Sequence, residues 1–197
     1  MACLAGTSCL AAAADPEVDC KSTKARTIER LMCRSPTLSR LDAELTRLYT
    51  LATGPKGGAP VSAIRKQQTA WIAQRAACAK SATQEECVRD QYLGRIAAIR
   101  AQSRPARGAD DRGISLGPFA FRCDKLDDVL DITYVNVDPG CAWITINDRS
   151  YPLVQQRSGS GARYEGNGTL FWEHQGEAQW RGTTSAPETT CRRVTTG

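Results

Sequence analysis

Nine cysteines constrain what this chain of 197 residues can fold into more than any other feature. Two of them, Cys3 and Cys9, lie in an apolar segment at the start of the sequence. The others are spread over the rest of the chain, at Cys20, Cys33, Cys78, Cys87, Cys123, Cys141 and Cys191. Because there is one histidine and no Cys-x-x-Cys pair, the spacing does not match a zinc site, and we predict neither a metal nor a cofactor. Cysteines at this density behind a leader-like segment are typical of an oxidising compartment, where they form disulfides.

Residues 1–14 are small and apolar and end in four alanines before Asp15. We interpret them as a secretory signal peptide with an Ala-x-Ala cleavage site; because the usual positive region is missing, the signal can be truncated at its start. We therefore predict secretion into the periplasm of a Gram-negative bacterium. Two alternatives stay open. Either Cys9 is the lipid-bearing cysteine of an outer-membrane lipoprotein, for which Gly6 is an unusual neighbour, or the segment is a buried N-terminal helix.

Residues 15–102 show the period of amphipathic helices. Leucines recur at steps of three and four between Leu38 and Leu51, which places them on one face of a helix. A stretch rich in Gly and Pro follows at 54–60, and further apolar stripes come after it. We predict a short helix near 23–33 and three longer helices near 36–53, 61–79 and 83–102, packed antiparallel.

Four cysteines flank these helices in pairs that are close in sequence. Cys20 and Cys33 flank the first predicted helix, and Cys78 and Cys87 flank the short connection between the last two. Sequence neighbours of this kind pair most easily, so we predict the disulfides Cys20–Cys33 and Cys78–Cys87. The alternative, four unpaired thiols, would be unusual in an oxidising compartment.

The second part of the chain differs in character. Residues 103–117 are rich in Arg, Asp, Gly and Pro and lack periodicity, so we predict a flexible linker. From residue 118 onward, short runs of β-branched and aromatic residues alternate with turn clusters, a pattern typical of an antiparallel sandwich or small barrel. The fold class that we predict is therefore α+β in two domains, a disulfide-stapled helical domain at 15–102 and a β-domain at 118–197.

The two parts also differ in charge. Residues 1–113 carry a formal net charge of +7 and residues 114–197 carry −2, which together give the +5 of the whole chain. A basic excess can attract nucleic acid or an anionic envelope surface. Since a secreted chain rarely meets nucleic acid, we predict no nucleic-acid partner. We interpret the excess as a solvated helical surface, with envelope association as an open alternative.

The helical part carries a set of spaced motifs. They are Asp19-Cys20, Thr27-x-Glu29-x-x-Met32-Cys33, Leu41-Asp42-x-x-Leu45, Gln68-x-x-Trp71, Arg75-x-x-Cys78 and Cys87. In this order they resemble the N-terminal domain of the LprI family, whose members are associated with lysozyme inhibition. The resemblance implies secretion and partner binding, and a scaffold or spacer is the alternative.

The β-rich part carries a second set. Its members are Phe121-Arg-Cys123, Ser158-Gly-Ser-Gly-Ala-Arg-Tyr164, Phe171-Trp172 and the terminal Cys191. These motifs resemble those of the MliC/PliC-like inhibitors of c-type lysozyme. The resemblance implies a small eight-stranded antiparallel β-barrel in which Cys123 pairs with Cys191. Cys141 is then left over, either buried or bridging two chains, so the oligomeric state stays open.

The same resemblance implies a binding site. In that family a serine and a lysine project from neighbouring loops into the lysozyme cleft and contact its two catalytic carboxylates. Ser160 falls on the serine position, and His174 stands where the lysine is usual. The candidate lysozyme-binding residues are Ser160, His174, Gly159, Gly161, Arg163, Tyr164 and Gln175. Because a histidine side chain is mostly neutral at neutral pH and gains charge below it, we predict that inhibition strengthens from about pH 8 to about pH 6.

Some of these residues have a second interpretation. Tyr164, like Phe171, Trp172 and Trp180, is better explained as barrel core than as a ligand contact, and Arg163 can either brace its loop or touch the target.

The function that we predict is inhibition of c-type lysozyme by a protein that is not an enzyme. One rival makes Ser160 a nucleophile and His174 its base, but the strand–turn–helix context of a nucleophile elbow is missing. The other rival is an envelope adapter that acts through the helical domain while the barrel is inactive as an inhibitor.

Overall fold

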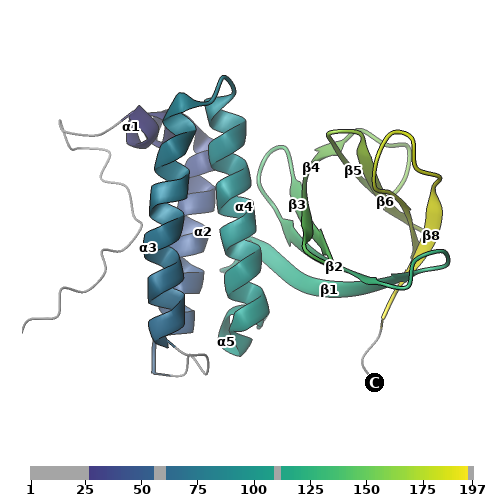
Figure 1. Ribbon diagram of the computed structural model, residues 1–197, viewed down its shortest axis with the longest axis horizontal. Coiled ribbons are helices and arrows are strands. Elements are labelled where there is room, and N and C mark those ends of the chain that lie inside the picture. Colours follow the sequence, from purple (N-terminus) through teal and green to yellow (C-terminus); the bar gives the residue numbers. More distant parts are fainter. Residues whose placement is uncertain (1–26, 56–60, 109–111, 195–197) are drawn as a thin grey trace, which may run out of the picture.

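A computed structural model describes residues 27–55, 61–108 and 112–194. Figure 1 shows a bundle of helices standing beside a closed β-barrel, with helix α4 between the rest of the bundle and the barrel. This arrangement confirms the predicted fold class. The predicted signal peptide at 1–14, with Cys3 and Cys9, lies outside the described residues. Among the helices that are described, none has the length and apolar character needed to cross a membrane.

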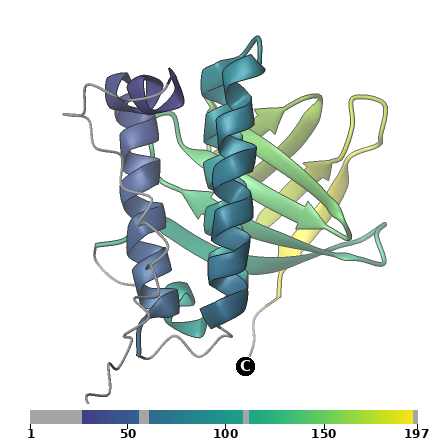
Figure 2. The ribbon, with the colours of Figure 1, turned by 60° about the vertical axis from the view of Figure 1, so that its left-hand side comes forward.

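The helices follow the predicted apolar stripes. Their bounds are α1 Thr27–Arg34, α2 Pro36–Thr53, α3 Val61–Ala77, the 3₁₀ helix η1 Cys78–Lys80, α4 Gln84–Gln102 and α5 Arg104–Arg107. The three long helices predicted near 36–53, 61–79 and 83–102 are confirmed, and α1 crosses one end of α2 (Figure 2). Helix α2 begins where it does because the hydroxyl of Ser35 accepts a hydrogen bond from the amide of Leu38 and Pro36 occupies the first turn.

The core of the bundle combines leucines with buried polar groups, one of which has three residues. The leucines of α2 at 38, 41, 45 and 48 are fully buried. Beside them the hydroxyl of Tyr92 donates to Asp42 at 2.7 Å, and Arg75 donates to the same hydroxyl. Burial raises the pKa of Tyr92 strongly, so the phenol stays protonated and keeps donating. The carboxylate of Asp42 and the hydroxyl of Tyr92 therefore have partners inside an apolar bundle.

One predicted disulfide of the bundle is confirmed. Cys78 of η1 is bonded to Cys87 of α4, with the two Cα atoms 5.6 Å apart. Cys33 is disulfide-bonded as well, whereas Cys20, its predicted partner, lies outside the described residues. The Cys78–Cys87 bond fixes the connection that turns the chain from α3 back into α4.

The β-rich part forms a closed antiparallel barrel, as predicted. Its strands are β1 Ser115–Cys123, β2 Val129–Val135, β3 Cys141–Ile146, β4 Arg149–Gln156, β5 Ala162–Gly166, β6 Thr169–His174, β7 Glu177–Arg181 and β8 Thr189–Arg193. Each strand pairs with the next, and β8 pairs back with β1, so no edge is left open. Cys123 and Cys191 face each other across that closing pair and form the second described disulfide. By the chain-entropy model a loop of this length contributes about 4 kcal/mol to stability.

The segment predicted as a flexible linker is largely structured. Within 103–117 the structure places helix α5, followed by the start of β1 at Ser115, and both Ala106 and Ser115 are buried. The physical cause is Arg100 at the end of α4, which is 1% exposed. Its guanidinium donates to the carbonyl of Gly117 at 2.8 Å, to the hydroxyl of Ser115 at 3.2 Å and to the carbonyl of Arg107 at 3.2 Å. Composition favoured a linker, but these bonds hold both described ends of the segment, at Arg107 and at Ser115 and Gly117.

Helix α2 contacts the same segment from the other side. Glu44, which is 3% exposed, accepts hydrogen bonds from the hydroxyl of Ser115 and from the amide of Ile114, and it pairs with Arg47 at 2.9 Å. The carboxylate is thus compensated although it is buried. Together Arg100 and Glu44 attach the first strand of the barrel to two helices of the bundle.

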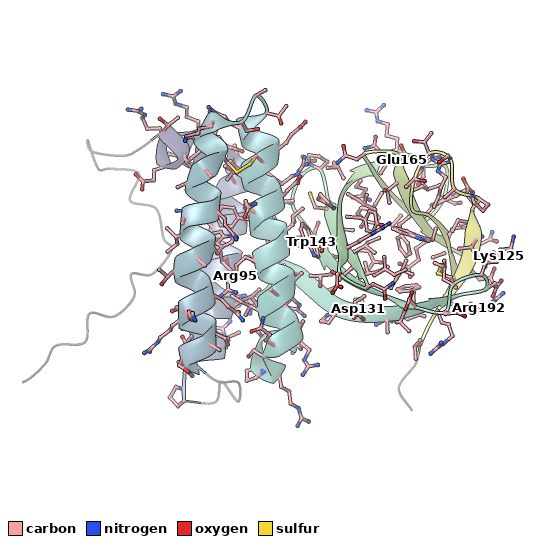
Figure 3. All side chains as sticks on the ribbon, in the orientation of Figure 1. Arg95, Lys125, Asp131, Trp143, Glu165 and Arg192 are labelled. Atoms are coloured by element: carbon pink, nitrogen blue, oxygen red, sulfur yellow. A yellow bond between two sulfur atoms is a disulfide. The ribbon has the colours of Figure 1, made fainter. Side chains whose placement is uncertain are left out.

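Apolar contacts continue across this joint. Trp143 of β3 lies between α4 and the barrel (Figure 3), and a Cβ placed on Gly94 of α4 would come within 2.9 Å of its ring. Val135, Val137 and Cys141 belong to the same hydrophobic cluster as the helices, separate from the cluster inside the barrel. The two parts therefore share buried surface.

Replacing Arg100 with alanine should destabilise the whole protein and not one part of it. The change removes three hydrogen bonds and takes a buried partner from the carbonyls of Gly117 and Arg107 and from the hydroxyl of Ser115. We expect a loss of about 2–4 kcal/mol in the free energy of unfolding. Urea unfolding followed by near-UV and far-UV circular dichroism measures it, with the exposed Arg104→Ala as the control. Two separate transitions in the parent protein would contradict a shared joint.

Cys141 should be chemically inert in the folded protein. It is the free cysteine of the described chain, it is 1% exposed, and burial raises the pKa of its thiol to about 11. Since the thiolate is the reactive species, we expect iodoacetamide at pH 8 to label it at least about 100-fold more slowly than in concentrated urea. Peptide mass spectrometry measures the labelling. A disulfide-linked dimer on a non-reducing gel would instead support the bridging alternative.

Candidate functional site

The two segments that carry the predicted site lie at the same end of the barrel. Residues 157–161 connect β4 to β5, and Gln175 and Gly176 form the turn between β6 and β7. In the β5–β6 pair Ala162 lies opposite Glu173, so the end of the 157–161 loop comes beside His174. The structure therefore brings together the two segments that carry Ser160 and His174, which stand 14 positions apart in the sequence.

The 157–161 loop is held by two hydrogen bonds and one close contact. The hydroxyl of Ser158 donates to the carbonyl of Gly161 at 3.0 Å, and the indole of Trp172 donates to the carbonyl of Ser160 at 2.9 Å. Gly161 has φ +67°, and a Cβ there would lie 2.1 Å from the carbonyl oxygen of Glu173. Only glycine fits such a position. The loop thus presents the exposed side chain of Ser160 from a fixed backbone.

His174 occupies the end of β6 and packs against one neighbour. Its ring centroid lies 4.3 Å from that of Trp172, and the side chain is half-buried. Phe171 is fully buried in the barrel, so the alternation of a strand places Trp172 and His174 together on the outer face. Gln175 follows at an exposed turn position with φ +51°. Trp172 therefore contacts both halves of the site.

Inside the barrel, a second group supports β6 beneath the site. The hydroxyl of Tyr134 donates to Glu173 at 2.7 Å, and the ring of Tyr134 lies 5.6 Å from that of Tyr164. Burial, helped by the bond to Glu173, raises the pKa of Tyr134, so this phenol stays protonated and keeps donating. Burial raises the pKa of Tyr164 as well. Because Glu173 precedes His174, this bond fixes the strand end from which the imidazole projects.

The seven candidate residues separate into three groups. Ser160, Gly161, His174 and Gln175 gather at one end of the barrel, and Gly159 is exposed with open space around its Cα. Tyr164 is buried in the core, as its second interpretation had it, together with Phe171 and Trp180. Arg163 braces its own strand by binding Glu165 through two nitrogens.

Sequence reasoning missed the role of Trp172, which was expected in the core. The alternation from the buried Phe171 contained the signal, because it assigns Trp172 to the face opposite the core. The bond from its indole to Ser160 crosses 12 positions and has no sequence signature.

The geometry also bears on the alternative function, an enzyme in which Ser160 is the nucleophile and His174 its base. A base that activates a serine must lie within hydrogen-bond reach of it, and in the described chain Ser160 and His174 share no hydrogen bond. Among the residues described, no group of three or more His, Cys, Asp or Glu side chains gathers as a metal site would require. The arrangement leaves the side chain of Ser160 exposed and that of His174 half-buried at the same end of the barrel.

Comparison with known proteins accounts for both parts of the chain. The family model "Lysozyme inhibitor LprI" matches residues 19–111, and the family model "Membrane-bound lysozyme-inhibitor of c-type lysozyme" (MliC) matches residues 121–189. The lipoprotein LprI of Mycobacterium tuberculosis and that of Mycobacterium bovis are each 30% identical over 168 residues, which are 84% of this chain and 79% of the relative. The chain belongs to the LprI family.

These findings confirm both resemblances drawn from the motifs, in the predicted order along the chain. The similarity to the LprI lipoproteins extends over both the bundle and the barrel and not over one part alone. None of the solved structures matches this LprI-family chain.

The two glycines of the site loop should respond differently to alanine. Gly161→Ala forces a side chain into a positive-φ position against the backbone of Glu173, so we expect a loss of about 1–3 kcal/mol in unfolding free energy. Gly159→Ala is the matched control, because nothing lies within 4 Å of its added Cβ. It should change stability by less than about 0.5 kcal/mol. Urea midpoints compare the two, and equal effects would contradict the contact described here.

Proposed function

We propose that this chain inhibits c-type lysozyme by inserting the 157–161 loop and the β6–β7 turn into the active-site cleft of the enzyme. Both matching family models are described as lysozyme inhibitors. The observation that carries the mechanism is the pairing of the two segments: Gly161 packs against His174 while Trp172 holds the carbonyl of Ser160. The loop that carries Ser160 thus lies beside the strand end that carries His174, and residues 157–161 and 174–176 together form one rim of the barrel.

The chemistry of the target explains why such a pair suits it. A glycosidase of this kind uses one carboxyl group as acid and another as nucleophile or stabiliser, on either side of the scissile bond. The hydroxyl of Ser160 can donate to one carboxylate and an imidazole N–H of His174 to the other. Bonds to a charged acceptor are stronger than neutral ones. Occupying both carboxylates blocks the sugar and the proton transfer together.

The rigidity of the rim makes the binding efficient. Loops that are ordered on binding lose conformational entropy, which reduces affinity. Here Ser158, Trp172 and the Tyr134–Glu173 bond already hold the two segments before any partner arrives. The Cys123–Cys191 disulfide fixes the barrel that carries them.

We place this activity at the cell envelope. The relatives are named lipoproteins, and the MliC model is described as membrane-bound. Within the envelope we propose the periplasm, with residues 1–14 as the signal, residues 15–102 as the helical domain and residues 118–197 as the inhibitor barrel. The lipoprotein relatives give weight to Cys9 as a lipid anchor, the alternative to cleavage after residue 14.

Substitutions at the two site residues test the proposal. We expect Ser160→Ala and His174→Ala each to raise the inhibition constant about tenfold, the equivalent of one lost charged hydrogen bond. His174→Lys should restore or tighten inhibition, because lysine is charged throughout the neutral range. The exposed Ser150→Ala, at the far end of β4, is the control. Inhibition is measured by lysis of bacterial cell walls with a c-type lysozyme, repeated with g-type and i-type enzymes.

The pH profile separates the role of His174 from that of Ser160. Because a carboxylate of the enzyme favours the charged form of an imidazole bound to it, parent protein should inhibit more strongly as pH falls from about 8 to about 6, while His174→Ala should show no such trend once the titration of the enzyme is subtracted. Identical profiles would remove His174 from the mechanism. If the double alanine variant inhibits as well as the parent, the helical part and not the barrel is the working part.

A further inference from the structure

A groove of about 1250 Å³ opens beside the proposed lysozyme-binding rim. One wall is Arg40 of α2 together with the 136–140 loop, and the other is the end of β4, the 157–161 loop and the start of β5. Ser158 and Gly161 of the rim are among its lining residues. The groove is therefore continuous with the rim, and the bundle and the barrel build it jointly.

The walls of this groove are held by polar contacts between the two parts. Arg40 donates to the carbonyl of Asn136 at 2.9 Å, and the hydroxyl of Thr37 donates to the carbonyl of Asp138 at 2.8 Å. On the barrel side the amide of Gln155 donates to the carbonyl of Gly140 at 2.7 Å. Helix α2 and the 136–140 loop thus form one fixed surface next to β4.

The charges in the groove are unequally compensated. Arg163 is neutralised by Glu165, which lies on the barrel rim in Figure 3. Arg40 binds a backbone carbonyl, which leaves its positive charge without a carboxylate at that bond. Arg157 is exposed, and in the described chain it takes part in no hydrogen bond or ion pair. Against these two guanidinium groups the lining offers the carboxylate of Asp138, so the groove keeps an excess of positive charge.

We propose that this groove is the second half of the lysozyme-binding surface, that it takes a carboxylate-bearing wall of the enzyme's cleft, and that Arg157 and Arg40 bind that wall. The inference rests on the function proposed above and adds the helical bundle to the interface. Its support is charge complementarity: even with Ser160 and His174 on the catalytic carboxylates, the negative potential of such a cleft attracts guanidinium groups beside it, and these bind carboxylates best among side chains. The groove adjoins Ser160, so both surfaces can engage one partner.

The test compares two arginines at opposite ends of one strand. Arg157 follows the end of β4, and Arg149 begins it, so the two lie about 26 Å apart. Both are exposed arginines outside helices, and Arg157→Gln and Arg149→Gln remove the same charge. Binding to a basic c-type lysozyme is measured by surface plasmon resonance at about 50 mM and about 300 mM NaCl, where screening lengths differ roughly twofold.

We expect Arg157→Gln to weaken binding about tenfold at low salt and by less at high salt, as for a charge that pairs across an interface. Arg149→Gln should leave binding unchanged or tighten it slightly, since it makes the inhibitor less positive towards a basic enzyme. Arg40→Gln should weaken binding about threefold, with a melting curve to show that α2 remains docked. If Arg157→Gln behaves like Arg149→Gln, the proposal for the groove is overturned.

This result is distinguishable from failure of the proposed function. If parent protein does not bind lysozyme, both proposals fall. If parent protein binds and Ser160→Ala weakens it while the groove variants do not, the rim alone is the interface. If Arg157→Gln weakens binding and Arg40→Gln does not, the groove contributes through the barrel only and the role of the bundle is rejected.

Discussion

The buried guanidinium of Arg100 determines how the two halves of this molecule meet. It ties the end of α4 to α5 and to the first strand of the barrel, at the point where the chain passes from one part to the other. A charge at 1% exposure is tolerated only with a full set of partners, and carbonyl groups together with the Ser115–Glu44 pair supply them. Because these partners come from both parts, the bundle has one position relative to the barrel. That position puts α2 beside the 136–140 loop and so creates the groove next to the site.

The site itself depends on β6, whose inward-facing and outward-facing residues have different roles. Residues facing inward anchor the strand, through Phe171 in the core and Glu173 bound to Tyr134. On the outward face, Trp172 donates to the carbonyl of Ser160 and packs its ring, tilted by 37°, against that of His174. This contact covers one side of the imidazole. A rim that is already ordered loses little conformational entropy on binding, but it adapts less to the shape of a partner.

Local patterns in the sequence predicted the elements, and long-range contacts decided the rest. The leucine period of α2 and the short alternating runs after residue 118 were sufficient for the fold class, and Cys78–Cys87 followed from proximity in the sequence. Glu44 gave no such signal. It borders the leucine face of α2, a position where a carboxylate is usually solvated, and the strand that covers it carries its partner Ser115, which is 71 positions later. The composition of 103–117 predicted mobility for the same reason, since nothing nearby in the sequence reveals that Arg100 binds it. The contact between Trp172 and Ser160 was equally hidden.

The imidazole of His174 and the guanidinium of Arg157 supply different combinations of hydrogen bonding and charge to a partner. An imidazole donates a hydrogen bond at any pH in the neutral range but carries a full charge only at the acidic end. A guanidinium carries its charge throughout, and its planar donors match a carboxylate. In the proposed complex, Ser160 and His174 bind the catalytic carboxylates, and their hydrogen bonds offset most of the cost of desolvating these acids. Arg157 supplies a positive charge that is independent of pH. The two contributions are therefore separable in principle: one changes with proton concentration and the other with ionic strength. An inhibitor that lacks a lysine at the tip can in this way retain a cation beside the cleft.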